Sequence, residues 1–297
     1  MLSILIPCYN NNVYSLVECL HREATNLTIP FEIIVQDDHS TNLFYNQEIN
    51  NINHCSFQIN TTNVGRSKNR NILLQQAQYS WVLLLDADVL PTSSSFLATY
   101  LHCLTTTQTD AIQGGVTYTN NSTQKHSLRW IYGKQREAIS LIQRQINPYS
   151  NTLCSNILIN REKITHLFDT SIALYGFEDL IFYKEIQKNN LKITAIDNTV
   201  EHLGLENNQL FVAKTEESCY NLAQLIAKHT LSYTDTKLSL YYFYLQHLRL
   251  CDLLSLGVFN LKKRLYNHLM GNSPSLIAFD IYKLLIYHQA TKAIQKK

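Results

Sequence analysis

Acidic residues that follow apolar runs are the side chains of this sequence best suited to chemistry. Asp86 and Asp88 come directly after the apolar residues 81–85 and are separated by one small residue. Such a run predicts a buried strand of a parallel sheet, which places both carboxylates at its carboxyl end, where open α/β sheets bind ligands. Two neighbouring carboxylates repel each other unless a cation lies between them, and a divalent ion bound to a diphosphate would supply that charge.

Two further segments could contribute to the same ligand site. Asp37 and Asp38 follow the strand-like residues 31–36, and a carboxylate there could accept a hydrogen bond from the ring N–H of a uracil or from a ribose hydroxyl. Gly65 is followed by three cations within five residues, at the predicted start of a helix that would favour a phosphate. Each segment also has a plainer interpretation, a turn in the first case and a solvated basic face in the second.

Two motifs lie later in the chain. Glu178 and Asp179 follow Tyr-Gly-Phe at a predicted helix start, where one acid could be a general base or both could complement the helix dipole. His202 follows the last predicted strand and could be a ligand, although a lone histidine is more often structural. The sequence has neither a G-x-G-x-x-G motif after the first strand nor a P-loop nor a G-x-S-x-G elbow, which disfavours classical dinucleotide, P-loop and serine-hydrolase sites.

The elements that would position these residues alternate between strands and helices. Strands are predicted at residues 3–9, 31–36, 56–60, 81–85, 111–118, 152–159 and 191–196, and helices at 13–23, 67–78, 93–104, 128–145 and 178–187. This alternation predicts an α/β fold with a doubly wound, mostly parallel sheet flanked by helices. Beyond residue 205 the pattern is helical only, at 210–229, 236–255 and 275–294, so we predict a domain of residues 1–204 and a C-terminal helical region of 205–297.

The composition of the chain limits which binding partners and which cellular compartment we expect for the protein. A net charge of +2 on 297 residues gives no sign of a nucleic-acid partner. The seven cysteines are scattered without a C-x-x-C pair, which favours a reducing, cytoplasmic compartment. We expect neither a secretory signal, since a strand-like run follows Met1 at once, nor a membrane span, since no apolar run reaches about 18 residues.

Five segments in fixed order carry a resemblance to a known family. They are SILIPCYNN, EIIVQDDHST, NVGRSKNRN, LLLDADVLP and YGFEDLIFYKEI. Together they resemble the family-2 glycosyltransferases, inverting enzymes of the GT-A fold, over roughly residues 1–204. The resemblance implies a GT-A type, Rossmann-like domain, which here is followed by C-terminal helices that match no pattern of the family.

The resemblance also implies roles for single residues. Asp88 would ligate a Mn²⁺ or Mg²⁺ ion that bridges the diphosphate, and Asp86 would bind the ribose or a metal-bound water. His202 would be a further ligand of the metal or the diphosphate. Asp179, or otherwise Glu178, would be the catalytic base. The residues implied in nucleotide-sugar binding are Ile6, Pro7, Tyr9, Asp37, Asp38, Gly65, Lys68, Arg70 and Asp86.

The implied reaction moves a sugar from a nucleoside diphosphate, with UDP favoured, to a hydroxyl of a growing surface glycan or a lipid-linked saccharide. The aromatic and basic C-terminal helices could pack over the acceptor site or touch an anionic membrane at its inner face. Two alternatives stay open. One is a nucleotidyltransferase acting on a sugar phosphate, and the other is a non-catalytic module that binds a nucleotide sugar.

Overall fold

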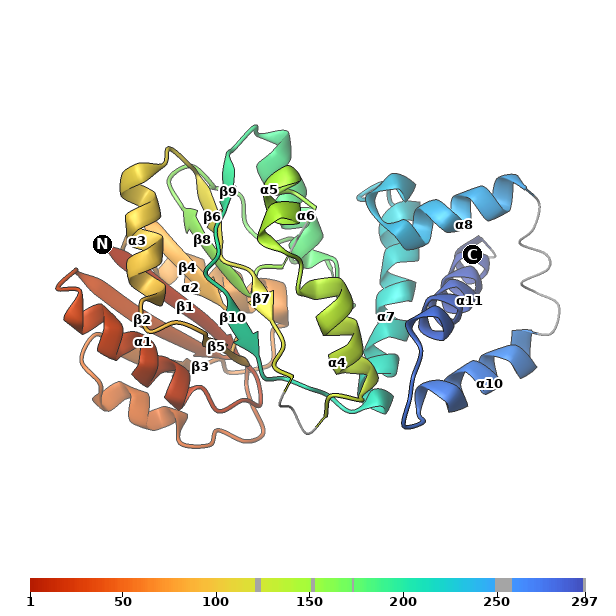
Figure 1. Ribbon diagram of the computed structural model, residues 1–297, viewed down its shortest axis with the longest axis horizontal. Coiled ribbons are helices and arrows are strands. Elements are labelled where there is room, and N and C mark those ends of the chain that lie inside the picture. Colours follow the sequence, from red (N-terminus) through yellow and green to blue (C-terminus); the bar gives the residue numbers. More distant parts are fainter. Residues whose placement is uncertain (121–123, 151–152, 173, 249–257, 296–297) are drawn as a thin grey trace. The chain divides into compact units, whose positions relative to one another are not determined.

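The computed structural model describes residues 1–120, 124–150, 153–172, 174–248 and 258–295, shown as a ribbon in Figure 1. The chain forms two compact units. Unit 1 consists of Met1–Thr119, Gln135–Ser171 and Glu178–Gly204, and unit 2 of Asn120–Lys134, Ile172–Phe177 and Leu205–Lys297. The C-terminal helices therefore share their unit with two short segments from earlier in the chain.

The larger sheet of unit 1 has seven strands in the order β3-β2-β1-β4-β8-β6-β9. Parallel pairing joins β3, β2, β1 and β4, and also β6 and β9, whereas β8 runs antiparallel to both of its neighbours. The predicted mostly parallel sheet is therefore confirmed. The strands are β1 Leu2–Cys8, β2 Phe31–Asp37, β3 Cys55–Ile59, β4 Trp81–Leu85, β6 Ala111–Gln113, β8 Asn156–Asn160 and β9 Ile193–Ala195.

Helices cover this sheet, which explains why its central strands are apolar on both faces. Leu5 of β1 and Leu84 of β4 lie in one buried cluster with Phe182 of the helix α6. Burial of a side chain of this size contributes about 1.5–3 kcal/mol relative to exposure. The helices of unit 1 in this region are α1 Tyr14–Asn26, the 3₁₀ helix η1 Asn46–Asn51, α2 Arg66–Gln76, α3 Phe96–Thr106 and α6 Glu178–Lys188.

A smaller sheet in unit 1 has the order β5-β10-β7, with bounds β5 Val89–Pro91, β10 Val200–His202 and β7 Val116–Thr117. The prediction of one strand over residues 111–118 is therefore wrong, because β6 joins the larger sheet and β7 the smaller. The chain changes sheet at Gly114 and Gly115. Gly115 has a φ of +89°, and a Cβ there would lie 2.8 Å from the Arg144 guanidinium, so no larger residue fits this turn.

The single helix predicted over residues 128–145 is also wrong. The structure has α4 Leu128–Tyr132, the π-helical turn η2 Gly133–Glu137 and then α5 Leu141–Ile146. Ser140 begins α5, because its side chain accepts a hydrogen bond from the Gln143 backbone N–H. The interruption lies where the chain passes from unit 2, which holds α4, to unit 1, which holds α5.

Unit 2 is helical in its described part, as the sequence pattern predicts beyond residue 205. In its core α7 packs along α11, and the Tyr242 hydroxyl lies 2.9 Å from His288 Nδ1. The helix α10 has no counterpart among the predicted elements, and residues 249–255 of the helix predicted over 236–255 lie outside the described residues. Besides α4, the helices are α7 Asn208–Ala227, η3 Tyr233–Asp235, α8 Lys237–His247, α10 Val258–Leu269 and α11 Leu276–Gln295.

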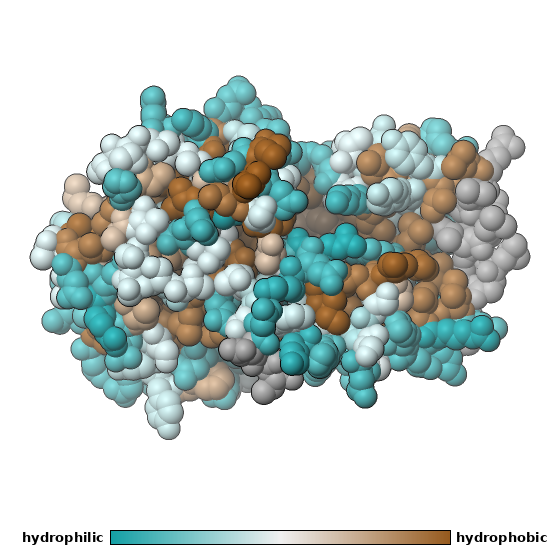
Figure 2. Space-filling model, in the orientation of Figure 1, coloured by the Kyte–Doolittle hydropathy of each residue, from teal (hydrophilic) through white to brown (hydrophobic). Residues whose placement is uncertain are grey.

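The surface of unit 2 mixes apolar and polar residues on the face drawn in Figure 2. Tyr241, Tyr244 and Leu248 lie three and four residues apart at α8, and all three are exposed. Within the described part of the chain, no helix is both long and apolar enough to cross a bilayer.

Candidate functional site

Arg70 joins two of the predicted acids in unit 1. Its Nη2 lies 2.8 Å from Asp86 Oδ1, and its Nη1 lies 2.5 Å from Asp179 Oδ1. The three residues come from α2, from the position after β4 and from the first turn of α6. The Arg70 side chain is only 1 % exposed, so its charge must be balanced by the protein itself.

A second arginine extends this cluster toward solvent. Arg66 Nε lies 3.3 Å from Glu178 Oε1, and Arg66 Nη2 lies 3.8 Å from Asp86 Oδ2. Its side chain is 46 % exposed. Arg66 was not among the predicted site residues, although its place one helical turn before Arg70 puts both cations on the same face of α2 and was a usable signal. We call Arg66, Arg70, Asp86, Glu178 and Asp179 the charge cluster.

Burial and charge act against each other within the charge cluster. Burial raises the pKa of Asp86, but Arg70 and Arg66 lower it by more, so the net pKa lies below its usual value. Burial raises the pKa of Asp179, and although Arg70 opposes this, the net pKa lies above its usual value. Burial lowers the pKa of Arg70, but its two carboxylate partners raise it by more, and the group stays charged. Asp86 is thus the firmly ionised acid, and Asp179 is the acid that takes up a proton more readily.

Asp37 and Asp38 hold loops at the end of β2. The Asp38 carboxylate accepts hydrogen bonds from the backbone N–H groups of Val64 at 2.7 Å and Gly65 at 2.9 Å. The Asp37 carboxylate accepts from the N–H and the hydroxyl of Ser40, one on each oxygen. Both oxygens of each acid are therefore engaged by the protein. A carboxylate oxygen can accept a second donor, so contact between Asp38 and a nucleotide base stays a prediction.

The other residues implied in nucleotide-sugar binding lie in different surroundings. Ile6 is fully buried in β1, between the covered faces of this central strand, and its implied place in a nucleoside pocket stays a prediction. Pro7 is half-buried, Tyr9 is exposed just past β1, and Lys68 is exposed on α2. Arg70 is buried within the charge cluster, so the geometry favours the positioning of acids over direct contact with a diphosphate.

Gly65 begins α2 with a backbone that few other residues adopt. Its φ is +85° and its ψ is 161°, and no atom lies within 4 Å of the place where a Cβ would stand. The glycine is therefore needed for its backbone conformation and not for space. Its N–H is the one that bonds Asp38, which ties the start of α2 to the end of β2.

Asp88 and His202 form a second acid-containing group in unit 1. His202 Nε2 lies 3.6 Å from Asp88 Oδ2, and the Leu203 N–H donates to the Asp88 carbonyl at 2.8 Å. A Cβ on Gly204 would lie 1.9 Å from Asp88 Oδ2, so the carboxylate could not keep this position beside a larger residue. The Asp86 carboxylate pairs with Arg70 and Arg66, and its predicted part as a further metal ligand stays a prediction.

The Asp88 and His202 pair fits a divalent ion that is shared with a diphosphate. Among the residues that the structure describes, no group of three histidine, cysteine or acidic side chains could hold a metal by itself. Mg²⁺ in phosphate sites typically takes one or two carboxylates and completes its shell with phosphate oxygens and water. Neighbouring ligands of an octahedral ion stand roughly 3 Å apart, so the 3.6 Å between His202 Nε2 and Asp88 Oδ2 would shorten on binding.

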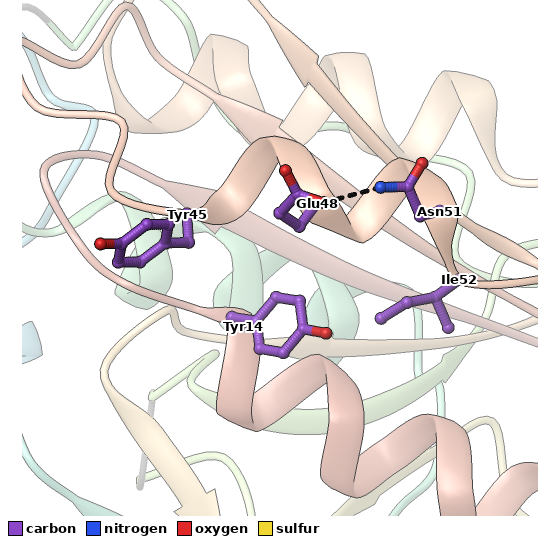
Figure 3. A pocket seen from close by; sticks show the side chains of 5 residues that line it. All are labelled: Tyr14, Tyr45, Glu48, Asn51 and Ile52. Carbon is purple, nitrogen blue, oxygen red and sulfur yellow. Dashed lines mark hydrogen bonds between the residues drawn. The ribbon is translucent and has the colours of Figure 1, made fainter.

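A shallow surface pocket in unit 1 lies at other residues. Figure 3 shows its lining, in which Tyr14 of α1 faces the 3₁₀ helix η1. The Asn51 side-chain amide donates to Glu48 Oε2 at 2.7 Å. Tyr45 and Ile52 complete the lining. None of the predicted site residues lines this pocket, so we assign it no part in the chemistry.

Known proteins resemble this chain in sequence pattern and in fold. Residues 3–168, more than half of the chain, match the model of a family described as "Glycosyl transferase family 2". No curated protein matches the chain.

Two solved structures share the fold. The mannosyltransferase PcManGT from Pyrobaculum calidifontis, in complex with GDP-Man and Mn²⁺, has a TM-score of 0.57 and 15 % identity, over 98 % of this chain and 86 % of that one. TarS 1–349 from S. aureus, in complex with UDP-GlcNAc, has a TM-score of 0.52 and 16 % identity, over 99 % and 91 %. These likenesses confirm the predicted GT-A fold class.

Proposed function

Because this chain belongs to glycosyl transferase family 2, we propose that it transfers a sugar from a nucleoside diphosphate to an acceptor hydroxyl, with inversion at the anomeric carbon. The observation that carries this proposal is the charge cluster. Arg70, Asp86 and Asp179 are far apart in sequence and meet where β4 ends and α6 begins. Carboxyl ends of parallel strands are where such sheets bind ligands.

Asp179 is the proposed catalytic base. The acceptor hydroxyl would lose its proton to this carboxylate while attacking the anomeric carbon from the side opposite the leaving diphosphate. A pKa above the usual value makes Asp179 the better proton acceptor. Glu178, which precedes it and is also buried, is the alternative base. Such base catalysis is worth about 10² to 10⁴ in rate, and a single displacement needs no covalent nucleophile.

Mn²⁺ or Mg²⁺ is the proposed cofactor, held by Asp88 and His202. Bound there, the ion would offset the negative charge that grows on the departing diphosphate. Gly204 supports this assignment because its missing side chain leaves the Asp88 carboxylate unobstructed. Asp86 would act next to this pair as an ionised acid that Arg70 and Arg66 hold in place.

The donor and acceptor are proposed more coarsely. UDP is the favoured nucleotide, and Pro7, Tyr9, Asp38 and Lys68 are the residues proposed to meet it. PcManGT is in complex with GDP-Man and TarS with UDP-GlcNAc, so both bases belong in a test. The acceptor is proposed to be a growing surface glycan or a lipid-linked saccharide, and not a nucleic acid.

Contact with the inner face of a membrane is proposed for unit 2, in a cytoplasmic protein. Its support is the exposed aromatic face of α8 and the basic residues Lys262, Lys263 and Arg264 of α10. The alternative is that these helices only pack within their unit. Flotation with anionic vesicles separates the two, because the variant Tyr241→Ser/Tyr244→Ser should lose flotation if α8 contacts lipid.

A panel of UDP- and GDP-sugars with Mn²⁺, scored for slow donor hydrolysis, tests the proposed transfer without an acceptor. We expect one donor to be hydrolysed, and we expect Asp179→Asn to bind that donor equally while losing most of its turnover. Full turnover in Asp179→Asn would contradict the base assignment but not the transfer.

The panel also tests the two alternatives. Release of pyrophosphate from a nucleoside triphosphate and a sugar phosphate would support the nucleotidyltransferase instead. Tight donor binding with no turnover, with or without glycan acceptors, would support a non-catalytic binding module.

A further inference from the structure

The smaller sheet of unit 1 places a tyrosine beside His202. In the parallel pair of β7 and β10, Thr117 lies opposite Glu201, so the next residues in register are Tyr118 and His202. Their rings stack with centroids 5.3 Å apart and an interplanar angle of 17°. The Tyr118 ring is fully buried, so this contact is fixed by the packing around it.

The far end of the Tyr118 ring is anchored as well. Its hydroxyl donates a hydrogen bond to Glu137 Oε2, at the last residue of η2. Strand pairing fixes the backbone before Tyr118, and Glu137 fixes its hydroxyl. The orientation of the Tyr118 ring is therefore fixed at both ends, and the imidazole of His202 stacks on it.

The other neighbour of His202 is Asp88, across the opposite edge of β10. β5 pairs with β10 so that Val89 lies opposite His202, and Asp88 directly precedes β5. Asp88 therefore lies diagonally to His202 and not directly opposite it. The His202 imidazole nevertheless has the Asp88 carboxylate near its Nε2 and the Tyr118 ring against its face.

We propose that Tyr118 is a positioning residue for metal binding, which acts by holding the imidazole of His202 with Nε2 toward Asp88. This inference rests on the proposed function, because it presumes that Asp88 and His202 bind a divalent ion. Groups that orient a ligating histidine typically change metal affinity 10–100-fold when they are removed, by order of magnitude. A packing role alone would change stability and leave that affinity as it is.

Mn²⁺ binding to the protein·UDP complex, followed by electron paramagnetic resonance of free Mn²⁺, measures this effect without any turnover. We expect Tyr118→Leu to bind Mn²⁺ about tenfold more weakly than the wild type. Because Tyr118 is proposed to act through His202, Tyr118→Leu should not lower the Mn²⁺ affinity further in a His202→Ala background. Tyr118→Phe keeps the stacked ring but loses the bond to Glu137, so a smaller loss is expected.

Tyr149→Leu is the matched control. Like Tyr118, Tyr149 is a tyrosine of unit 1 with an anchored hydroxyl: it is partly buried against the core, and its hydroxyl donates to the Leu191 carbonyl at 2.8 Å. This variant should bind Mn²⁺ as the wild type does, although it also loses a ring and a hydrogen bond.

The inference is overturned if Tyr118→Leu binds Mn²⁺ like the wild type, or if it loses the same factor in the His202→Ala background. If Tyr118→Leu does not fold, Tyr118→Phe decides, and an unchanged Mn²⁺ affinity then contradicts the proposal. A wild-type protein that binds UDP but no Mn²⁺ would refute the metal site together with Tyr118's role. Metal-free donor hydrolysis in that case would leave the proposed transfer standing.

Discussion

Arg70 holds Asp86 and Asp179 through separate nitrogens of one planar group. The guanidinium therefore sets the distance between the two acids, which a lysine with its single nitrogen cannot do. Removing one partner of a buried ion pair leaves a charge without compensation, at a cost of about 3–5 kcal/mol. The charge cluster is for this reason sensitive to substitutions that conserve charge.

We expect Arg70→Lys to lower the free energy of unfolding by about 3 kcal/mol and to slow donor hydrolysis, because one acid loses its partner. Urea unfolding and the donor panel measure the two effects. Arg22→Lys is the control, since Arg22 lies 3.9 Å from Glu18 in a largely exposed pair. Such a surface pair is worth at most about 1 kcal/mol, so equal losses in both variants would contradict the prediction.

The rate of transfer should depend on pH through the raised pKa of Asp179. A base must be unprotonated to act, so kcat/KM should fall as the pH drops through a pKa above that of an ordinary aspartate, and level off above it. Asp86, whose pKa is lowered, should stay ionised throughout this range. Glu178→Gln identifies the base: the acidic limb should persist in this variant, and its disappearance would assign the base to Glu178.

The local sequence pattern predicted single acids of the charge cluster, but it did not predict which residues contact one another. Asp86 was predicted from the apolar run before it and Asp179 from its place at a helix start. Their link through Arg70 joins residues 109 positions apart in one case, and no local spacing reports such a distance. Arg66 lay within the predicted basic segment and one helical turn before Arg70, but the sequence does not show that acids distant in the chain face it.

The chain passes from the larger sheet to the smaller one twice, between β6 and β7 and between β9 and β10. Buried polar groups hold these two passages together. The Asn156 amide of β8 donates to the Gly115 carbonyl at 2.8 Å and to the Asn198 carbonyl at 2.9 Å. Gly115 precedes β7 and Asn198 precedes β10. Asn156 therefore holds together the two turns from which β7 and β10 depart, and with them the positions of Tyr118 and His202.

We expect Asn156→Asp to lower the free energy of unfolding by about 2 kcal/mol, because a carboxylate cannot donate to either carbonyl. The Asn198 carbonyl then loses the donor described above, and the Gly115 carbonyl keeps the Val200 N–H. Urea unfolding measures the loss. Asn160→Asp on the same strand is the control, since its Oδ1 accepts from the Glu162 N–H at 3.0 Å and an aspartate keeps that bond. Equal stabilities of the two variants would contradict the assigned role of Asn156.

Hydrophobic periodicity predicted the strands of the larger sheet. It failed where one predicted element is two separate elements in the structure. Residues 111–118 are rich in strand-forming residues, and such a pattern predicts a strand but not the sheet in which it lies. Gly114 and Gly115 marked the division. The same holds for residues 128–145, where a helical pattern continues across the passage between two units.

At the scale of the whole molecule, the chain passes between the units in the middle of a motif. Tyr175, Gly176 and Phe177 belong to unit 2, whereas Glu178 and Asp179 begin α6 in unit 1. Within unit 2, the Asn221 amide of α7 donates to the carbonyls of Tyr175 at 3.3 Å and Gly176 at 2.7 Å. The segment that precedes the proposed base in the chain is thus held by α7 within unit 2.

We expect Asn221→Asp to release this segment, because an aspartate cannot donate to its carbonyls. Hydrogen exchange at residues 174–177 should rise, and turnover should fall while UDP affinity stays unchanged. Asn208→Asp is the control, since Asn208 donates to the Leu269 carbonyl at 2.9 Å and bonds no residue of that segment. Equal exchange at 174–177 in both variants would contradict the prediction.

Because unit 2 is assembled from three stretches of sequence, exchanging it between relatives would take three grafts and not one splice at Leu205. A chain cut after Gly204 would keep α4 and residues 174–176 without the helices that they contact in unit 2. Recombination between such genes should therefore preserve a working protein only when its crossovers spare all three stretches.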